Sequence, residues 1–144
     1  MREAGGGTRE AGRIMPTVIV QNYRDLRAWK YAMALAKDVY QATTAFPDNE
    51  KFGLISQMRR AAVSIPSNLA EGHARSSTAE LRQFVSIALG SVTELETQVL
   101  LSADLGYLQT DAKQNLLTRL DVIDKMLYGL RKALACRMNA TQNK

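Results

Sequence analysis

The sequence predicts an all-α protein folded as an antiparallel, up-down-up-down four-helix bundle. Apolar residues make up 46% of the 144-residue chain and aromatic residues only 6%, a composition that favours helices over sheets. Apolar side chains recur every three or four positions in four successive stretches, as on the buried face of an amphipathic helix. The stretches between them are short, so consecutive helices should pack side by side in opposite directions.

The first two helices are expected over residues 25–44 and 49–72. The segment Phe46-Pro47-Asp48 separates them, because proline cannot continue a helix. Asp48 suits the N-cap position of the second helix, where its carboxylate accepts a hydrogen bond from a free backbone N–H group. Gly72 marks the end of this helix.

The last two helices are expected over residues 77–105 and 110–136. Ser77 and Glu80 have the spacing of a capping box, with a hydroxyl at the N-cap and a carboxylate three residues later. Gly106 is a suitable stop signal for the third helix. The expected organisation is a flexible extension over residues 1–21, the bundle over 22–136 and a polar tail over 137–144. Met15 is an alternative start of the protein.

Pro66 lies in the middle of the second predicted helix, within the polar stretch 64–72. An interior proline removes one backbone donor and costs about 3 kcal/mol or more. We therefore expect a kink near Pro66. We also expect Asn68 to bond the carbonyl of Ala62, directly or through a water molecule, because this carbonyl loses its usual helical donor.

Polar side chains are predicted to form a seam between the second and third helices. With a turn near Ser76, residue 60 lies level with about residues 92–94. Ser64 should then lie near Gly90, and either Arg59 or Arg60 should face Glu94 or Glu96. This polar seam comprises Arg59, Arg60, Ser64, Ser67, Asn68, Glu71, Glu94, Glu96 and Gln98. It is either a network that fixes helix register or a contact for a ligand or subunit.

Positive charge is concentrated near the C-terminus. The net charge is +5 and the sequence pI is about 9.6. Residues 24–109 carry nine basic and nine acidic side chains, whereas the residues after 109 carry seven Lys or Arg and three Asp. A basic helix suits nucleic acid; the alternative is a solvated face that maintains solubility. The candidate contacts are Arg75, Arg119, Arg131, Lys132 and Arg137.

Motifs for catalysis, cofactors and metals are absent from the sequence. His73 is the single histidine and has no Glu three residues before it, which argues against a di-iron bundle. There is no P-loop, dinucleotide fingerprint or nucleophile elbow. We therefore expect a non-enzymatic protein without a cofactor or metal. A rival hypothesis uses Glu71 and Glu94 as catalytic carboxylates, which requires an open pocket and raised pKa values.

The single cysteine, Cys136, excludes an internal disulfide and fits a reducing cytoplasmic compartment. No uninterrupted apolar run approaches the roughly 20 residues that a membrane span needs. We therefore expect a cytoplasmic protein that does not enter a membrane.

The heptapeptide Leu26-Arg27-Ala28-Trp29-Lys30-Tyr31-Ala32 resembles the first-helix signature of a family of bacterial four-helix-bundle proteins. This family is known as the 23S rRNA intervening-sequence or S23-type family, and its members are encoded in insertions within large-subunit ribosomal RNA genes and elsewhere. The resemblance covers about residues 23–134, and Leu69 stands where the family usually has Ile. Further matching segments, in order, are Phe46-Pro47, Gly53-Leu54, 57–62, 64–72, Gly90-Ser91 and 94–98.

The resemblance implies an oligomeric partner of nucleic acid. The family is similar to the accessory variability determinant of diversity-generating retroelements, a basic pentameric ring that works with a reverse transcriptase. It therefore implies a homo-oligomer, with a pentameric ring and RNA or DNA as a partner. The alternative is a protein–protein interaction scaffold without nucleic-acid binding. Apolar residues outside the main helix stripes independently favour a subunit interface: Ile87, Leu100, Leu101, Leu116 and Val122.

Overall fold

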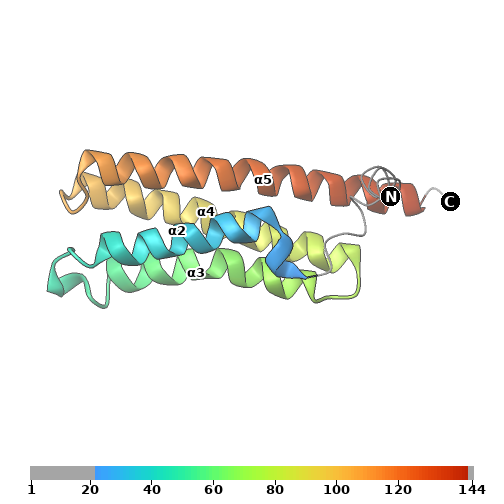
Figure 1. The fold of residues 1–144 in the computed structure, drawn as a ribbon, viewed down its shortest axis with the longest axis horizontal. Helices are drawn as coiled ribbons and strands as arrows, with labels where there is room; N and C mark the ends of the chain where they lie inside the picture. The colour runs from blue at the N-terminus through green and yellow to red at the C-terminus, as the bar shows by residue number, and fades with distance from the viewer. Residues whose placement is uncertain (1–21, 143–144) are drawn as a thin grey trace, which may run out of the picture.

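The computed structural model describes residues 22–142, and over this range the protein is helical, without strands. The expected all-α four-helix bundle is confirmed (Figure 1). The long helices are α2 (Arg27–Thr43), α3 (Leu54–His73), α4 (Thr78–Asp104) and α5 (Thr110–Gln142); the short 3-10 helices are η2 (Tyr23–Asp25) and η3 (Asp48–Glu50). The extension predicted for residues 1–21 lies outside the described residues.

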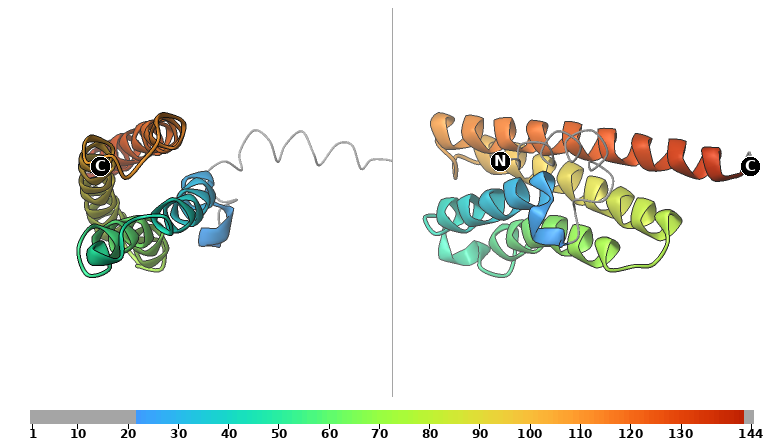
Figure 2. Two further views of the ribbon diagram at one scale, coloured as in Figure 1. Left: turned by 90° about the vertical axis from the view of Figure 1, so that its left-hand side faces the viewer. Right: turned by 45° about the vertical axis from the view of Figure 1, so that its right-hand side comes forward.

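The four long helices enclose one core. Helix α3 packs against α2 and α4, helix α4 packs against α5, and α5 also contacts α2. The connections between consecutive helices lie at alternate ends of the bundle (Figure 1). Side-chain contacts agree with an antiparallel pair of helices: Met58, early in α3, meets Ser102, late in α4, and the later Ser64 meets the earlier Ser91. An end view shows the helices arranged around a common centre (Figure 2).

Aliphatic side chains from all four helices fill this core. Leu116 was expected at a subunit interface, but it is 1% exposed and belongs to the core. The expectation for Leu116 was wrong because its direction on α5 follows from how that helix packs against α2 and α4. The largest fully buried side chains are Leu35, Met58, Ile65, Leu69, Leu95, Leu116, Leu120, Ile123, Leu127 and Leu134.

Helix α3 begins later than predicted. Asp48 starts the 3-10 helix η3 and does not cap α3, which begins at Leu54 after the N-cap residue Gly53. The side chain of Glu50 takes the role expected of Asp48: its Oε1 accepts a hydrogen bond from the Leu54 N–H at 3.1 Å. The longer glutamate side chain reaches forward across the turn to a backbone donor that the helix leaves free.

Pro66 lies inside α3 and is buried. Asn68 does not bond the Ala62 carbonyl directly; its Nδ2 donates to the Ser64 carbonyl at 2.8 Å and to Ser64 Oγ at 2.9 Å. The reason is geometric: a side chain on a helix points back over the preceding turn toward the N-terminus. Asn68 therefore reaches Ser64, four residues earlier. The bend at Pro66 stays a prediction.

Helix α4 has the predicted signals at both ends. Ser77 Oγ accepts a hydrogen bond from the Glu80 N–H at 3.1 Å and donates to the Glu80 carboxylate at 3.0 Å, so the capping box forms. Gly106 ends the helix with a φ of +82°, a conformation that glycine adopts without strain. The N–H of Tyr107 then donates to the Ser102 carbonyl at 2.9 Å, as in a Schellman motif.

Helix α5 continues to Gln142, so residues 137–142, expected as part of a tail, are helical.

Helix α4 is, by length and composition, apolar enough to span a membrane. Helix α4 packs against both α3 and α5, and the core helices of soluble bundles meet the same criterion.

Candidate nucleic-acid interface

Two of the predicted cationic contacts lie together on α5. Arg131 and Lys132 line a shallow pocket of about 300 Å³ with Arg82 from α4 and the ring of Tyr128. The Arg131 guanidinium lies 4.9 Å from the centre of that ring, and its NH1 donates to Ser86 Oγ at 3.3 Å. We call Arg82, Tyr128, Arg131 and Lys132 the basic cluster. Asp and Glu are absent from the lining of this pocket.

The other predicted cations have local partners. Arg75 pairs with Glu71 on α3 at 2.9 Å. Arg119 on α5 pairs with Asp38 on α2 at 2.7 Å, which joins the first and last helices of the bundle. A carboxylate that neutralises an arginine reduces its attraction for phosphate. Arg137 is exposed on α5, beyond the basic cluster.

The polar seam forms in part between α3 and α4. Ser64 Oγ lies 2.8 Å from the hydroxyl of Ser91, one residue from the position of Gly90 that we predicted. Because Asn68 also donates to Ser64, three polar side chains share one network at this level. Such a network fixes the relative position of two helices, since sliding by one turn would separate its members.

Among the nine residues of the polar seam, Gln98 is the one that is fully buried. Gln98 is buried, and its Nε2 donates to Glu94 Oε2 at 3.3 Å on the same helix. Its Oε1 is buried without a hydrogen-bond partner among the described residues. Glu94 therefore bonds within α4 and does not join α4 to α3.

Of the two arginines that could face Glu94 or Glu96, Arg59 does not, and the alternative for Arg60 stays a prediction. Arg59 Nε donates to the buried hydroxyl of Thr43 at 2.9 Å, and NH2 donates to the Tyr40 carbonyl at 3.2 Å. The guanidinium also lies 4.5 Å from the centre of the Tyr40 ring. Arg59 thus points toward α2, because successive helical residues are turned by about 100° and the packing decides which neighbour each one meets.

The remaining seam residues lie on the surface. The exposed set is Arg60, Ser67, Glu71, Glu94 and Glu96. Neither Glu71 nor Glu94 lines a pocket described on this chain. Within residues 22–142 no group of three or more His, Cys, Asp and Glu side chains is placed to hold a metal ion. Glu71 and Glu94 therefore do not share any of these four pockets.

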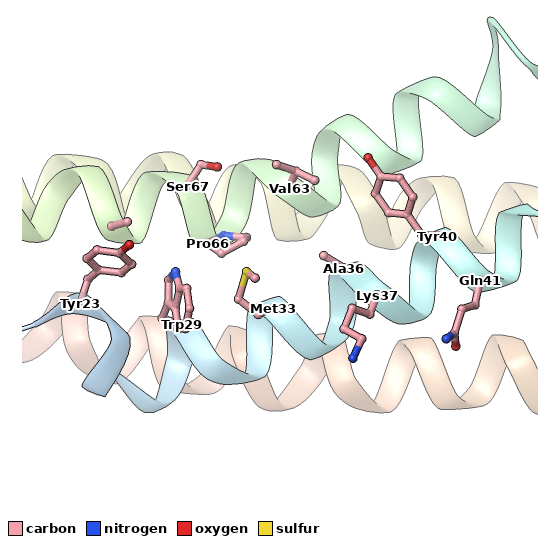
Figure 3. A pocket seen from close by; sticks show the side chains of 11 residues that line it. Tyr23, Trp29, Met33, Ala36, Lys37, Tyr40, Gln41, Val63, Pro66 and Ser67 are labelled. Carbon is pink, nitrogen blue, oxygen red and sulfur yellow. The ribbon is translucent and has the colours of Figure 1, made fainter.

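Two pockets on the α2–α3 side of the bundle were not predicted from the sequence. The apolar groove has a volume of about 590 Å³, and Figure 3 shows side chains of α2 and α3 pointing toward one another across it. Its lining includes Tyr23, Trp29, Met33, Val63, Pro66 and Ala70. The turn pocket adjoins it near the α2–α3 connection and measures about 680 Å³. Its lining includes Tyr40, Lys51, Phe52, Ser56, Arg59 and Arg60.

The turn pocket could not be found from net charge. Lys51, Arg59 and Arg60 belong to a stretch whose basic and acidic residues balance. Charge counted along the sequence is neutral there, but the fold gathers these cations on one surface. The one available signal was Phe52, a large apolar residue outside the helical apolar stripes.

The fold and the basic cluster define a basic, all-helical bundle without a recognisable catalytic centre among its described residues. The family model described as 23S rRNA-intervening sequence protein matches residues 24–129, and the chain belongs to this family. The resemblance inferred from the sequence is thereby confirmed. No curated protein matches the chain.

A solved structure shares the fold. It is the crystal structure of a protein of unknown function from the S23 ribosomal protein family of Bacteroides thetaiotaomicron, with a TM-score of 0.67 and 21% sequence identity. The match covers 73% of this chain and 95% of that one. At this identity the similarity establishes the fold alone.

Proposed function

We propose that this protein is a non-enzymatic, oligomeric accessory protein that binds RNA or DNA through the basic cluster. The observation that carries the proposal is the grouping of Arg82, Arg131 and Lys132 around the exposed ring of Tyr128 without an acidic side chain in the pocket lining. Phosphate groups are held by such cations, and an exposed aromatic ring can stack on a base.

Fluorescence anisotropy with labelled RNA and DNA oligonucleotides at about 50 mM and 200 mM salt tests the proposal. We expect binding at low salt that weakens steeply as salt rises, because phosphate contacts release counterions. Replacing both cations (Arg131→Gln with Lys132→Gln) should lower the salt dependence by about one unit of slope for each lost contact.

Lys125→Gln is the matched control for this experiment. Lys125 lies on the same helix as the basic cluster, but Asp121 already neutralises it at 3.0 Å. Its replacement should leave affinity nearly unchanged. Absence of binding by the wild-type protein at low salt would overturn the proposal.

Exposed apolar side chains on α4 support self-association. Ile87, Leu100 and Leu101 on α4, and Leu105 at its C-cap, are each between 43% and 51% exposed. Neighbouring apolar residues that are exposed on a monomer surface favour a protein contact. We infer a homo-oligomer, with the five-membered ring that the family resemblance implies as the expected form. The rival function, a protein-interaction scaffold without nucleic acid, rests on the same surface and predicts assembly without RNA or DNA binding.

We place the protein in the cytoplasm. Cys136 is an exposed, free cysteine, and a thiol in this setting stays reduced in the cytoplasmic redox environment. Bacterial cell fractionation with an antibody against the protein tests this placement, and recovery in the membrane fraction would contradict it.

A further inference from the structure

The turn pocket carries chemistry that the basic cluster does not explain. We propose that it binds one unpaired nucleotide of a single-stranded nucleic acid, with the base on Phe52 and the phosphate near Lys51 and the two arginines. This inference rests on the proposed function, because it assigns a subsite for the same class of ligand. The basic cluster lies on α4 and α5, so the two sites use different elements of the bundle.

The charge of the turn pocket favours an anion. Lys51, Arg59 and Arg60 line it, and neither Asp nor Glu is part of its lining. Arg59 is half-buried, and its partners in the described part of the chain are neutral: a threonine hydroxyl, a backbone carbonyl and an aromatic ring. A partly desolvated cation without a counter-charge is costly, and a phosphate group would supply that charge.

Arg59 is also held in place before any ligand arrives. Its bonds to Thr43 and to the Tyr40 carbonyl use two of its five N–H donors, so three remain for a ligand. The Tyr40 ring, whose centre lies 4.5 Å from the guanidinium carbon, further restricts this side chain. A fixed planar fork of donors suits the paired oxygens of a phosphate, and little side-chain entropy is lost on binding.

The aromatic residues of the pocket suit a base. Phe52 is 87% exposed, an unusual state for a phenylalanine, and Lys51 Nζ lies 5.7 Å from the centre of its ring. A base stacked on this ring would cover apolar surface that water now contacts. Stacking of this kind accepts any base, so the site would show little sequence preference.

The geometry favours a single strand over a duplex. In a duplex the base faces are stacked on one another, so an aromatic side chain at the surface reaches only phosphates and sugars. An unpaired base can turn out of the strand and enter a cavity. The turn pocket, at about 680 Å³, lies within the roughly 300–1,000 Å³ typical of small-ligand sites.

The test compares Phe52→Ala with the wild-type full-length protein by fluorescence anisotropy. The probes are short single-stranded oligouridine, short single-stranded oligothymidine and an RNA duplex, all at low salt. We expect Phe52→Ala to weaken binding of both single strands about fivefold or more and to change duplex binding less than about twofold. Because Phe52 is exposed, the variant should fold normally, which its thermal melting curve checks.

Tyr31→Ala is the matched control. Tyr31 is an exposed aromatic residue on α2 with a nearby arginine, Arg27, and it lines neither the turn pocket nor the apolar groove. Its replacement should leave all three affinities unchanged. A loss of single-strand affinity equal to that of Phe52→Ala would overturn the subsite, since the effect would not be specific to the pocket.

The remaining outcomes separate this inference from the proposed function. If Phe52→Ala binds single strands as the wild type does, the subsite is wrong while binding through the basic cluster stands. If the wild-type protein binds none of the probes, the proposed function fails and the subsite with it. If Phe52→Ala changes the molar mass in light scattering but not the affinities, the pocket is a contact between copies, and the inference is overturned.

Discussion

Glu50 joins two distant turns of the bundle through its two carboxylate oxygens. Oε1 accepts a hydrogen bond from the Leu54 N–H at the start of α3, and Oε2 accepts one from the Tyr107 hydroxyl at 3.1 Å. The Tyr107 ring also lies 5.3 Å from the ring of the buried Phe46. One side chain thus caps a helix and holds the α4–α5 turn against the α2–α3 connection.

The titration of Tyr107 reports on this contact. The hydrogen bond to Glu50 raises the pKa of Tyr107 above its usual 10.0, and burial and the negative charge of Glu50 act in the same direction. The folded state therefore holds this proton more tightly than the unfolded chain. The raised pKa of Tyr107 therefore adds to the free energy of unfolding. This stabilisation is fully present below about pH 10 and is lost as the pH rises above it.

Urea denaturation of the wild type and of Tyr107→Phe across about pH 8 to 11 measures this effect. The difference in free energy of unfolding between the two proteins should be constant up to about pH 9 and should shrink above about pH 10. The same pH dependence in both proteins would show that Tyr107 titrates as it does in the unfolded chain.

At the level of the elements, a glycine allows α3 to approach α4 closely near the turn that connects them. A Cβ added at Gly72 would lie 2.7 Å from the Cβ of Phe84 and 3.1 Å from Leu81 Cδ1, both on α4. The absence of a side chain at Gly72 therefore lets the end of α3 pack directly on the first turns of α4. Gly90, in the middle of α4, has no such neighbour within 4 Å.

Alanine at these two glycines should have opposite effects on stability. Gly72→Ala forces the helices apart and should lower the free energy of unfolding by about 1–3 kcal/mol, the usual cost of overpacking. Gly90→Ala removes helix-interior glycine without a clash and should raise it by about 0.5–1 kcal/mol. Urea denaturation of both variants measures the two changes, and a stabilised Gly72→Ala would refute the packing argument.

At the level of the whole molecule, the exposed face of α4 predicts assembly. Leu101 is 47% exposed, between the similarly exposed Leu100 and Leu105. We expect the wild-type protein to be larger than a monomer in size-exclusion chromatography with light scattering. Leu101→Glu places a charge where the contact would be desolvated and should shift the protein toward the monomer.

Gln83→Glu serves as the control for the assembly prediction. It adds the same charge at an exposed position of the same helix, near the α3–α4 turn and away from Leu101. Its molar mass should equal that of the wild type. A monomeric wild-type protein at high concentration would contradict both the homo-oligomer and the expected five-membered ring.

The elements of this fold could be predicted because their signals are local. The capping box at Ser77 and Glu80 and the stop at Gly106 act through groups only a few residues apart. The apolar periodicity depends on the helical repeat, which is the same in every packing arrangement. The start of α3 was missed because Asp48 and Glu50 both suit a cap, and only the path of the turn selects between them.

The sequence alone determined the four helices, their approximate ends, the basic C-terminal segment and the family to which the chain belongs. Only the tertiary structure decided that Arg59 turns toward Tyr40 on α2, that Asp38 neutralises Arg119, and that two pockets open beside α2 and α3. The physical reason is that helical repeat fixes which residues share a face, while the rotation and register of packed helices fix what that face meets. Ion pairs and pockets depend on shifts of a few ångströms in the relative position of packed helices. The spacing of residues along one chain does not reveal such shifts.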